Sequence, residues 1–66
     1  MKKIPDPKYW LGDTILFESK TDTGAQTYQG TIVVAYVSKG GWFYEISIYN
    51  RIVKELKESD ILYKKP

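Results

Sequence analysis

The sequence contains no cysteine and no histidine, and no stretch in it has the roughly 20 apolar residues that a membrane-spanning helix needs. The lack of cysteine excludes disulfides and a thiol nucleophile. The lack of histidine removes the commonest general base and the commonest metal ligand. No carboxylates cluster at ligand spacing either, so we expect no metal, no cofactor and no enzymatic activity.

With 66 residues, the chain is too short for a dinucleotide-binding sheet or a barrel of eight strand–helix units. It is long enough for one small domain, which would bury only about 60% of the surface of its unfolded chain. Without disulfides or a metal, such a domain needs dense packing or association with further copies. Ten aromatic residues can provide dense packing, and assembly into a homo-oligomer is the alternative way to stabilise the domain.

The charge divides the chain into an arm, a body and a tail. Residues 1–9 form a basic arm that Pro5 and Pro7 hold extended, residues 10–63 form the domain, and residues 64–66 form a basic tail. Between residues 9 and 63 there are five basic and seven acidic side chains, so the body is slightly acidic. The first ten residues lack the apolar run of a secretory signal, and we expect a cytoplasmic protein with no membrane partner.

The residue pattern predicts an all-β fold. Five runs rich in β-branched and aromatic residues are separated by polar or glycine-containing segments. An alternative for residues 51–63 is one helix, but four strands without a fifth would leave an open sheet edge. We expect strands over residues 14–18, 28–37, 42–49, 52–56 and 62–63, a polar loop over 19–27, tight turns at 38–41 and 50–51, and a helical turn over 58–61.

Alternation within the strands predicts which side chains face the core. Ile15 and Phe17 share one face of their strand, as do Tyr44, Ile46 and Ile48 of theirs. Glu45 and Ser47 mark the opposite face as solvated, which places Phe43 and Tyr49 among the exposed aromatics. Strict alternation over 32–37 places Ile32, Val34 and Tyr36 on one face and Val33, Ala35 and Val37 on the other, with a bulge or bend at Gly30.

The layout resembles that of small SH3-like barrels, including KOW and Tudor domains. The resemblance covers residues 11–63 and implies a five-stranded barrel with a short helical turn before the last strand. It also implies a binding module, which suits a phage or plasmid accessory protein or an inhibitor of a host factor. The segments that carry it are Leu11-Gly12-Asp13-Thr14-Ile15, Tyr28-Gln29-Gly30-Thr31-Ile32-Val33, Trp42-Phe43-Tyr44-Glu45-Ile46 and Glu58-Ser59-Asp60-Ile61.

The segment Tyr28-Gln29-Gly30-Thr31-Ile32-Val33 is also similar to a strand of the plasmid-encoded type II dihydrofolate reductases. Those enzymes are SH3-like barrels that assemble as tetramers around a pore lined by a Val-Gln-Ile-Tyr strand. The corresponding segment here is Val53-Lys54-Glu55-Leu56, in which only the valine matches. The resemblance implies an oligomeric enzyme as an alternative function, without the glutamine that would face its substrates.

The candidate site consists of aromatic and basic residues rather than catalytic ones. Exposed aromatic rings beside an arginine are typical of protein–protein hot spots, so we expect a protein partner. One alternative is single-stranded nucleic acid stacked on Phe43 and Tyr49, flanked by Lys39 and Arg51. Another is a methylated cation held in a Tudor-like cage of Tyr28, Trp42 and Tyr49. Glu55 and Glu58 alternate with lysines and are expected to be a solvated surface. The predicted binding residues are Trp42, Phe43, Tyr49, Arg51, Tyr28 and Lys39.

Overall fold

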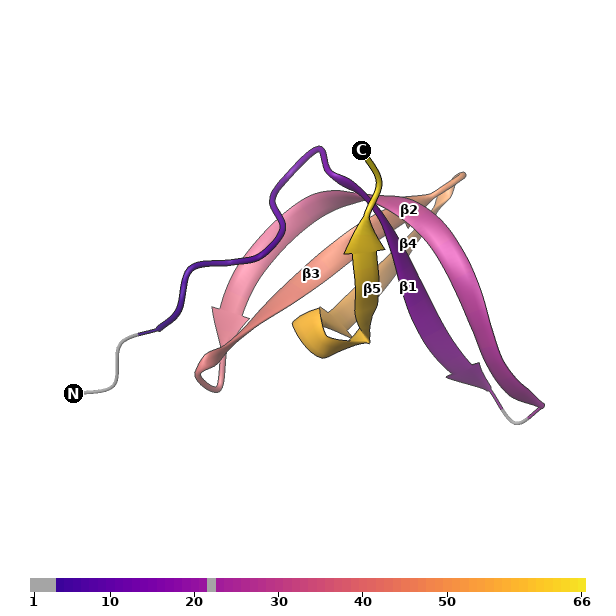
Figure 1. Cartoon of the computed structure of the whole chain (residues 1–66), viewed down its shortest axis with the longest axis horizontal. Coiled ribbons are helices and arrows are strands. Elements are labelled where there is room, and N and C mark those ends of the chain that lie inside the picture. The colour runs from indigo at the N-terminus through magenta and orange to yellow at the C-terminus, as the bar shows by residue number, and fades with distance from the viewer. Residues whose placement is uncertain (1–3, 22) are drawn as a thin grey trace.

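A computed structural model describes residues 4–21 and 23–66 and shows five antiparallel strands (Figure 1). Its one helical element is a 3-10 turn of three residues, so the described part of the chain has no helix that could cross a membrane. The all-β prediction and the short turn before the last strand are confirmed, and the alternative of one helix over 51–63 is wrong. The elements are β1 (Thr14–Thr21), β2 (Gly24–Ser38), β3 (Gly41–Ile48), β4 (Arg51–Lys57), η1 (Glu58–Asp60) and β5 (Ile61–Lys64).

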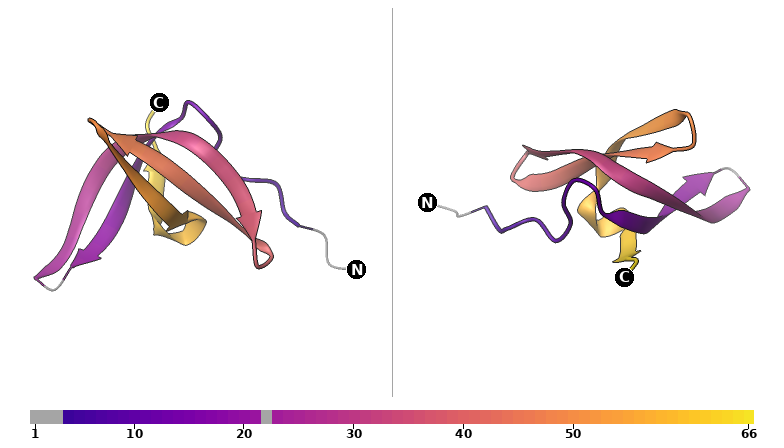
Figure 2. Two further views of the ribbon diagram at one scale, coloured as in Figure 1. Left: turned by 180° about the vertical axis from the view of Figure 1, so that it is seen from behind. Right: turned by 90° about the horizontal axis from the view of Figure 1, so that it is seen from above.

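The sheet has the order β4-β3-β2-β1-β5 and is bent into an arch (Figures 1 and 2). β2 is long enough to pair with β1 along its first half and with β3 along its second half. The β1–β2 hairpin forms one leg of the arch and the β2–β3 hairpin forms the other, and η1 and β5 lie between these legs. β4 and β5 are the sheet edges, and the arrangement is compatible with a small β-barrel-like fold.

Gly30 lies near the middle of β2 and is buried. A Cβ atom at this position would lie 2.9 Å from the backbone oxygen of Ser47 and 3.0 Å from Cγ1 of Ile48, and it would also strike Ile46. The missing side chain therefore lets the backbone of β3 at Ser47 lie close against β2.

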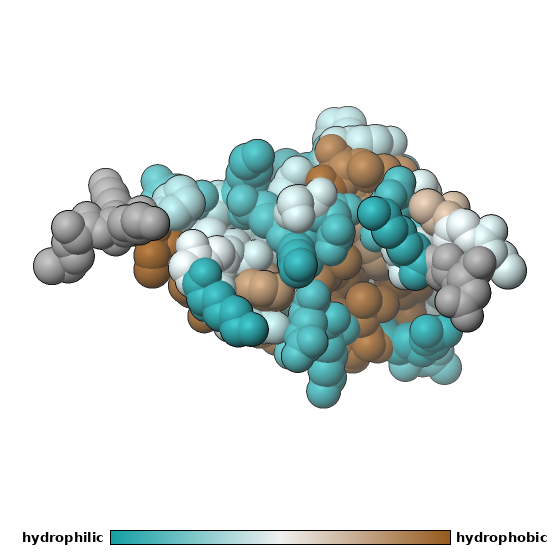
Figure 3. Space-filling model, turned by 90° about the horizontal axis from the view of Figure 1, so that it is seen from below, coloured by the Kyte–Doolittle hydropathy of each residue, from teal (hydrophilic) through white to brown (hydrophobic). Residues whose placement is uncertain are grey.

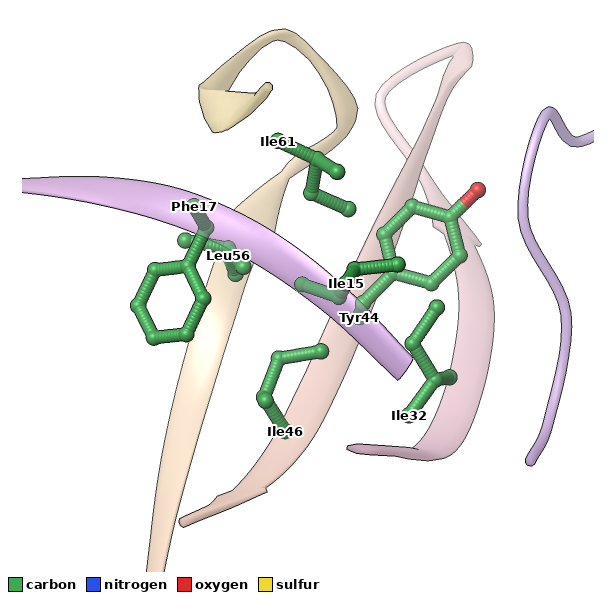
Figure 4. Packing of buried hydrophobic residues seen from close by; sticks show 7 residues of the cluster. All are labelled: Ile15, Phe17, Ile32, Tyr44, Ile46, Leu56 and Ile61. Carbon is green, nitrogen blue, oxygen red and sulfur yellow. The ribbon is translucent and has the colours of Figure 1, made fainter. Parts of the chain in front are cut away.

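The core lies on the concave side of the arch, and every strand contributes to it (Figure 4). The inward positions predicted for Ile15, Phe17, Tyr44 and Ile46 are confirmed, and Ile48 packs against the same cluster while remaining partly exposed. The seven buried hydrophobic residues are Ile15, Phe17, Ile32, Tyr44, Ile46, Leu56 and Ile61.

The predicted loop over residues 19–27 is wrong, because most of this segment continues the β1–β2 hairpin. Ser19 pairs with Gln26, and Lys20 pairs with Ala25. The segment is polar on both faces, and a solvated ribbon of this kind gives no hydrophobic alternation from which to recognise a strand. Gly24, with a φ of 128°, supplies a backbone conformation that suits the tight turn at the end.

Strict alternation over residues 32–37 is also wrong, because a β-bulge lies between Ile32 and Val34. The extra residue leaves Val33 and Val34 both exposed and turns Ala35 toward the core. Tyr36 then lies on the outer face. A bulge inserts one residue on one strand only, so every later side chain changes face.

Candidate binding grooves

The structure separates the six predicted site residues into two groups at two grooves. A groove of about 400 Å³, here called the tyrosine groove, contains Tyr28, Tyr49 and Arg51. A shallower groove of about 680 Å³, here called the tryptophan groove, contains Lys39, Trp42 and Phe43. Figure 3 shows the underside of the arch, where hydrophobic side chains gather between hydrophilic ones in the half that holds the β1–β2 hairpin.

The tyrosine groove lies between the β1–β2 hairpin and the β3–β4 turn, and hydrophobic side chains form its floor. The ring of Tyr28 lies 5.8 Å, centroid to centroid, from that of buried Phe17. Its hydroxyl donates a 2.6 Å hydrogen bond to Oε1 of Gln26, which fixes the ring's direction. Tyr28 thus links the wall of the groove to its buried floor. The main lining residues are Phe17, Tyr28, Ile48, Tyr49, Arg51 and Val53.

Tyr49 occupies an unusual position at the rim of this groove. It lies in the β3–β4 turn, whose central residues are Tyr49 and Asn50 rather than the predicted Asn50 and Arg51. Its φ of 55° is in the left-handed region, which disfavours a bulky side chain, and its residue surface is 99% exposed. The fold therefore gains no burial from this ring and keeps it in a strained conformation.

Arg51 is the first residue of β4, where it pairs with Ile48. It is exposed, and it carries the only charge among the described residues that line the tyrosine groove. Within residues 4–21 and 23–66, no carboxylate forms an ion pair with it. Its guanidinium is thus available for a carboxylate from outside the chain.

At the tryptophan groove, the predicted residues already contact other parts of the chain. The indole Nε1 of Trp42 donates a 2.7 Å hydrogen bond to the backbone oxygen of Pro5. Phe43 is half-buried and stacks on Tyr36, with ring centroids 5.8 Å apart. Lys39 forms part of the β2–β3 turn with a φ of 53°. Trp42 therefore packs against the core, whereas Phe43 lies with Tyr36 on the outer face and is less exposed than alternation indicated.

Tyr44 and Glu58 form a polar link beside this groove. The Tyr44 hydroxyl donates a 2.7 Å hydrogen bond to Oε2 of Glu58, and the backbone N–H of Lys8 donates to the same oxygen at 3.1 Å. Burial, reinforced by the hydrogen bond to Glu58, raises the pKa of Tyr44 far above that of an exposed tyrosine. Tyr44 is therefore held neutral as a structural donor.

This raised pKa predicts a loss of stability in alkali. In the unfolded chain Tyr44 ionises near pH 10, whereas in the folded chain it keeps its proton. Its contribution to stability is complete below about pH 10 and is lost as the pH rises toward the folded-state pKa. We expect the free energy of unfolding of the wild type to fall more steeply above about pH 10 than that of Tyr44→Phe, measured by urea unfolding. Equal slopes would contradict this assignment.

The sequence pattern missed the part played by Phe17, Ile48 and Val53, which line the tyrosine groove while packing against the core. The sequence predicted that Phe17 and Ile48 point inward, but it did not predict that they lie at the edge of a groove. The described residues hold no group of three or more acidic side chains placed to bind a metal ion. Comparison with protein-family models, curated proteins and solved structures finds no match for this chain.

Proposed function

We propose that this chain is a non-enzymatic binding module of the SH3-like barrel type whose tyrosine groove holds an extended segment of a partner protein. The strand order, the arched β2 and the 3-10 turn before β5 support this type of fold. The observation that carries the function is Tyr49, whose fully exposed ring sits on a strained backbone beside Arg51, an arginine with no ion pair among the described residues. Such strain is typically kept at sites that serve function rather than folding.

The groove defines the chemistry of the segment it accepts. Its hydrophobic floor at Phe17, Ile48 and Val53 would receive one apolar side chain, and the rings of Tyr28 and Tyr49 would flank it. Arg51 would pair with a carboxylate on the same segment in a charge-assisted hydrogen bond. Tyrosine and arginine are the residue types that most often dominate interface energies.

The charge of the body favours a protein segment over nucleic acid. Residues 9–63 carry a net charge of −2, which repels a polyanion outside the immediate range of Arg51. A single carboxylate on a peptide needs only that one arginine, whereas binding of a nucleic-acid backbone needs several cationic contacts along its length.

The test is selection from a displayed random-peptide library with the full chain as bait. We expect enriched peptides that combine an acidic residue with a large apolar one. Arg51→Ala should weaken the binding of an enriched peptide by about tenfold or more, as expected for a hot spot. Tyr63→Ala is the matched control, because Tyr63 is an exposed tyrosine on β5 that does not line the groove, and it should bind like wild type.

Two outcomes would overturn this function. One is the absence of any enriched peptide, or peptides whose binding Arg51→Ala leaves unchanged. The other is tight binding of a labelled single-stranded oligonucleotide that weakens steeply with added salt, which would assign the groove to nucleic acid instead.

A further inference from the structure

The N-terminal arm docks against β3 and η1, and its Pro5 forms one wall of the tryptophan groove. Where the structure describes it, this arm (residues 4–9) runs along one leg of the sheet (Figure 1). Two backbone groups of the arm bind side chains of the body. The Pro5 oxygen accepts from Trp42, and the Lys8 N–H donates to Glu58. The ring of Tyr9 meets Tyr44 edge to face, with centroids 6.1 Å apart.

The arm docks as a separate, preformed piece. Pro5 and Pro7 have no backbone N–H and hold the chain extended, so little conformational entropy is lost when it docks. None of its contacts lies within a strand pairing of the sheet, and its partners Trp42, Tyr44 and Glu58 belong to β3 and η1. The arm can therefore leave β3 and η1 without breaking the sheet.

One turn directs the arm back onto its own body. The N–H of Trp10 donates to Oδ2 of Asp13 at 2.9 Å, and the N–H of Asp13 donates to the oxygen of Trp10 at 3.1 Å. Gly12 lies inside this turn with a φ of 90°, a conformation that other residues rarely adopt. If Gly12 became extended, the same arm would project away from its body.

We propose that this arm exchanges between copies, so that the arm of one chain docks on β3 and η1 of a second chain, beside its tryptophan groove, and the arm of the second chain docks in the same way on the first. Every contact of the docked arm is available in the exchanged pair, so the two states differ mainly in the turn at Gly12 and in the entropy of association. Residues 1–8 carry a net charge of +2 and residues 9–63 carry −2, so the arm of one copy is attracted to the body of another. The exchange leaves the tyrosine groove free and is independent of the function proposed for it.

The first test is Gly12→Ala in the full chain, followed by sedimentation velocity over a range of concentrations. An alanine Cβ at this position meets nothing within 4 Å, so the substitution acts through the backbone conformation alone. It strains the closed turn in each monomer, and exchange relieves that strain twice per dimer. A short tether keeps the arm at an effective local concentration of about millimolar, so wild type should dimerise only near that range. We expect Gly12→Ala to dimerise at a concentration at least tenfold lower.

Adding Trp42→Phe provides the control. It removes the indole N–H that holds the Pro5 oxygen, so the double variant should return to the monomer. A Gly12→Ala chain that stays monomeric at millimolar concentration would overturn the proposal. Dimers that persist in the double variant would overturn it as well, because they would form through another surface.

A second readout keeps the test decisive if Gly12→Ala folds poorly. The chain has no cysteine, so single cysteines can be placed as Asp6→Cys on the arm and as Ser59→Cys at the groove in otherwise wild-type chains. When the two variants are mixed at high concentration and treated with a short thiol cross-linker, exchange predicts a cross-linked heterodimer. The matched pair Asp6→Cys and Asn50→Cys, whose second cysteine lies at the other groove, should give far less. Equal yields from the two pairs would contradict exchange.

Discussion

Replacing Ile46 by alanine is expected to lower the free energy of unfolding by about 2–5 kcal/mol, the usual range for truncating a buried isoleucine to alanine. The side chain is 0% exposed, lies opposite Ile32 of β2 and Val53 of β4, and covers the position where Gly30 lacks a Cβ. A domain of this size has total stability near the lower end of the usual range of about 5–15 kcal/mol. The variant should therefore be partly unfolded near room temperature.

Ile52→Ala is the matched control for this prediction. Ile52 lies on the neighbouring strand β4, opposite Ser47, and is 49% exposed on the outer face. The same substitution there should change the free energy of unfolding by less than about 0.5–1 kcal/mol. Both variants can be compared by urea unfolding followed through tryptophan fluorescence. Similar losses at the two positions would show that the core does not lie under the arch.

Tyr49→Gly is expected to separate folding from binding. Glycine adopts the φ of 55° without strain, and the exposed ring contributes no burial, so the free energy of unfolding should rise by about 0.5–1 kcal/mol. The same change removes one ring from the tyrosine groove. The affinity for a selected peptide should fall by about 30-fold, which corresponds to the roughly 2 kcal/mol of an interface hot spot.

Tyr63→Gly provides the control with the opposite sign. Tyr63 is 52% exposed within β5. Glycine has a low strand propensity and loses more backbone entropy on folding than tyrosine, so this variant should be less stable than wild type. It should still bind the peptide. If Tyr49→Gly also lost stability, its ring would serve the fold. If it kept full peptide affinity, Tyr49 would not belong to the binding site.

Much of the core was predictable, because Ile15 and Phe17, like Tyr44 and Ile46, recur at the two-residue period of a strand, and Glu45 and Ser47 mark the opposite face of theirs as solvated. The alternation failed where the backbone departs from a regular ladder. The bulge after Ile32 and the position of the β3–β4 turn each depend on a shift of one residue that hydrogen bonding between strands decides. A residue pattern carries no trace of such a shift.

The division of the candidate site has a simple geometric origin. Trp42 and Tyr49 are seven residues apart on either end of an extended strand, which places them roughly 23 Å from each other at about 3.3 Å per residue. One small ligand cannot contact both, and this separation could have been deduced from the predicted strand. The contact between Trp42 and Pro5 could not, because it joins segments 37 residues apart and depends on how the arm folds back at Gly12.

The central claim is that residues which folding does not require, Tyr49 and Arg51, form a binding surface together with the floor beneath them. Its most direct test is chemical-shift mapping by nuclear magnetic resonance when a peptide from the library selection is titrated into the full chain. We predict that the largest shifts fall on Phe17, Tyr28 and residues 48–53, around the tyrosine groove. Shifts confined to Trp42, Glu58 and the arm, or to the outer face at Val34 and Tyr63, would contradict the claim.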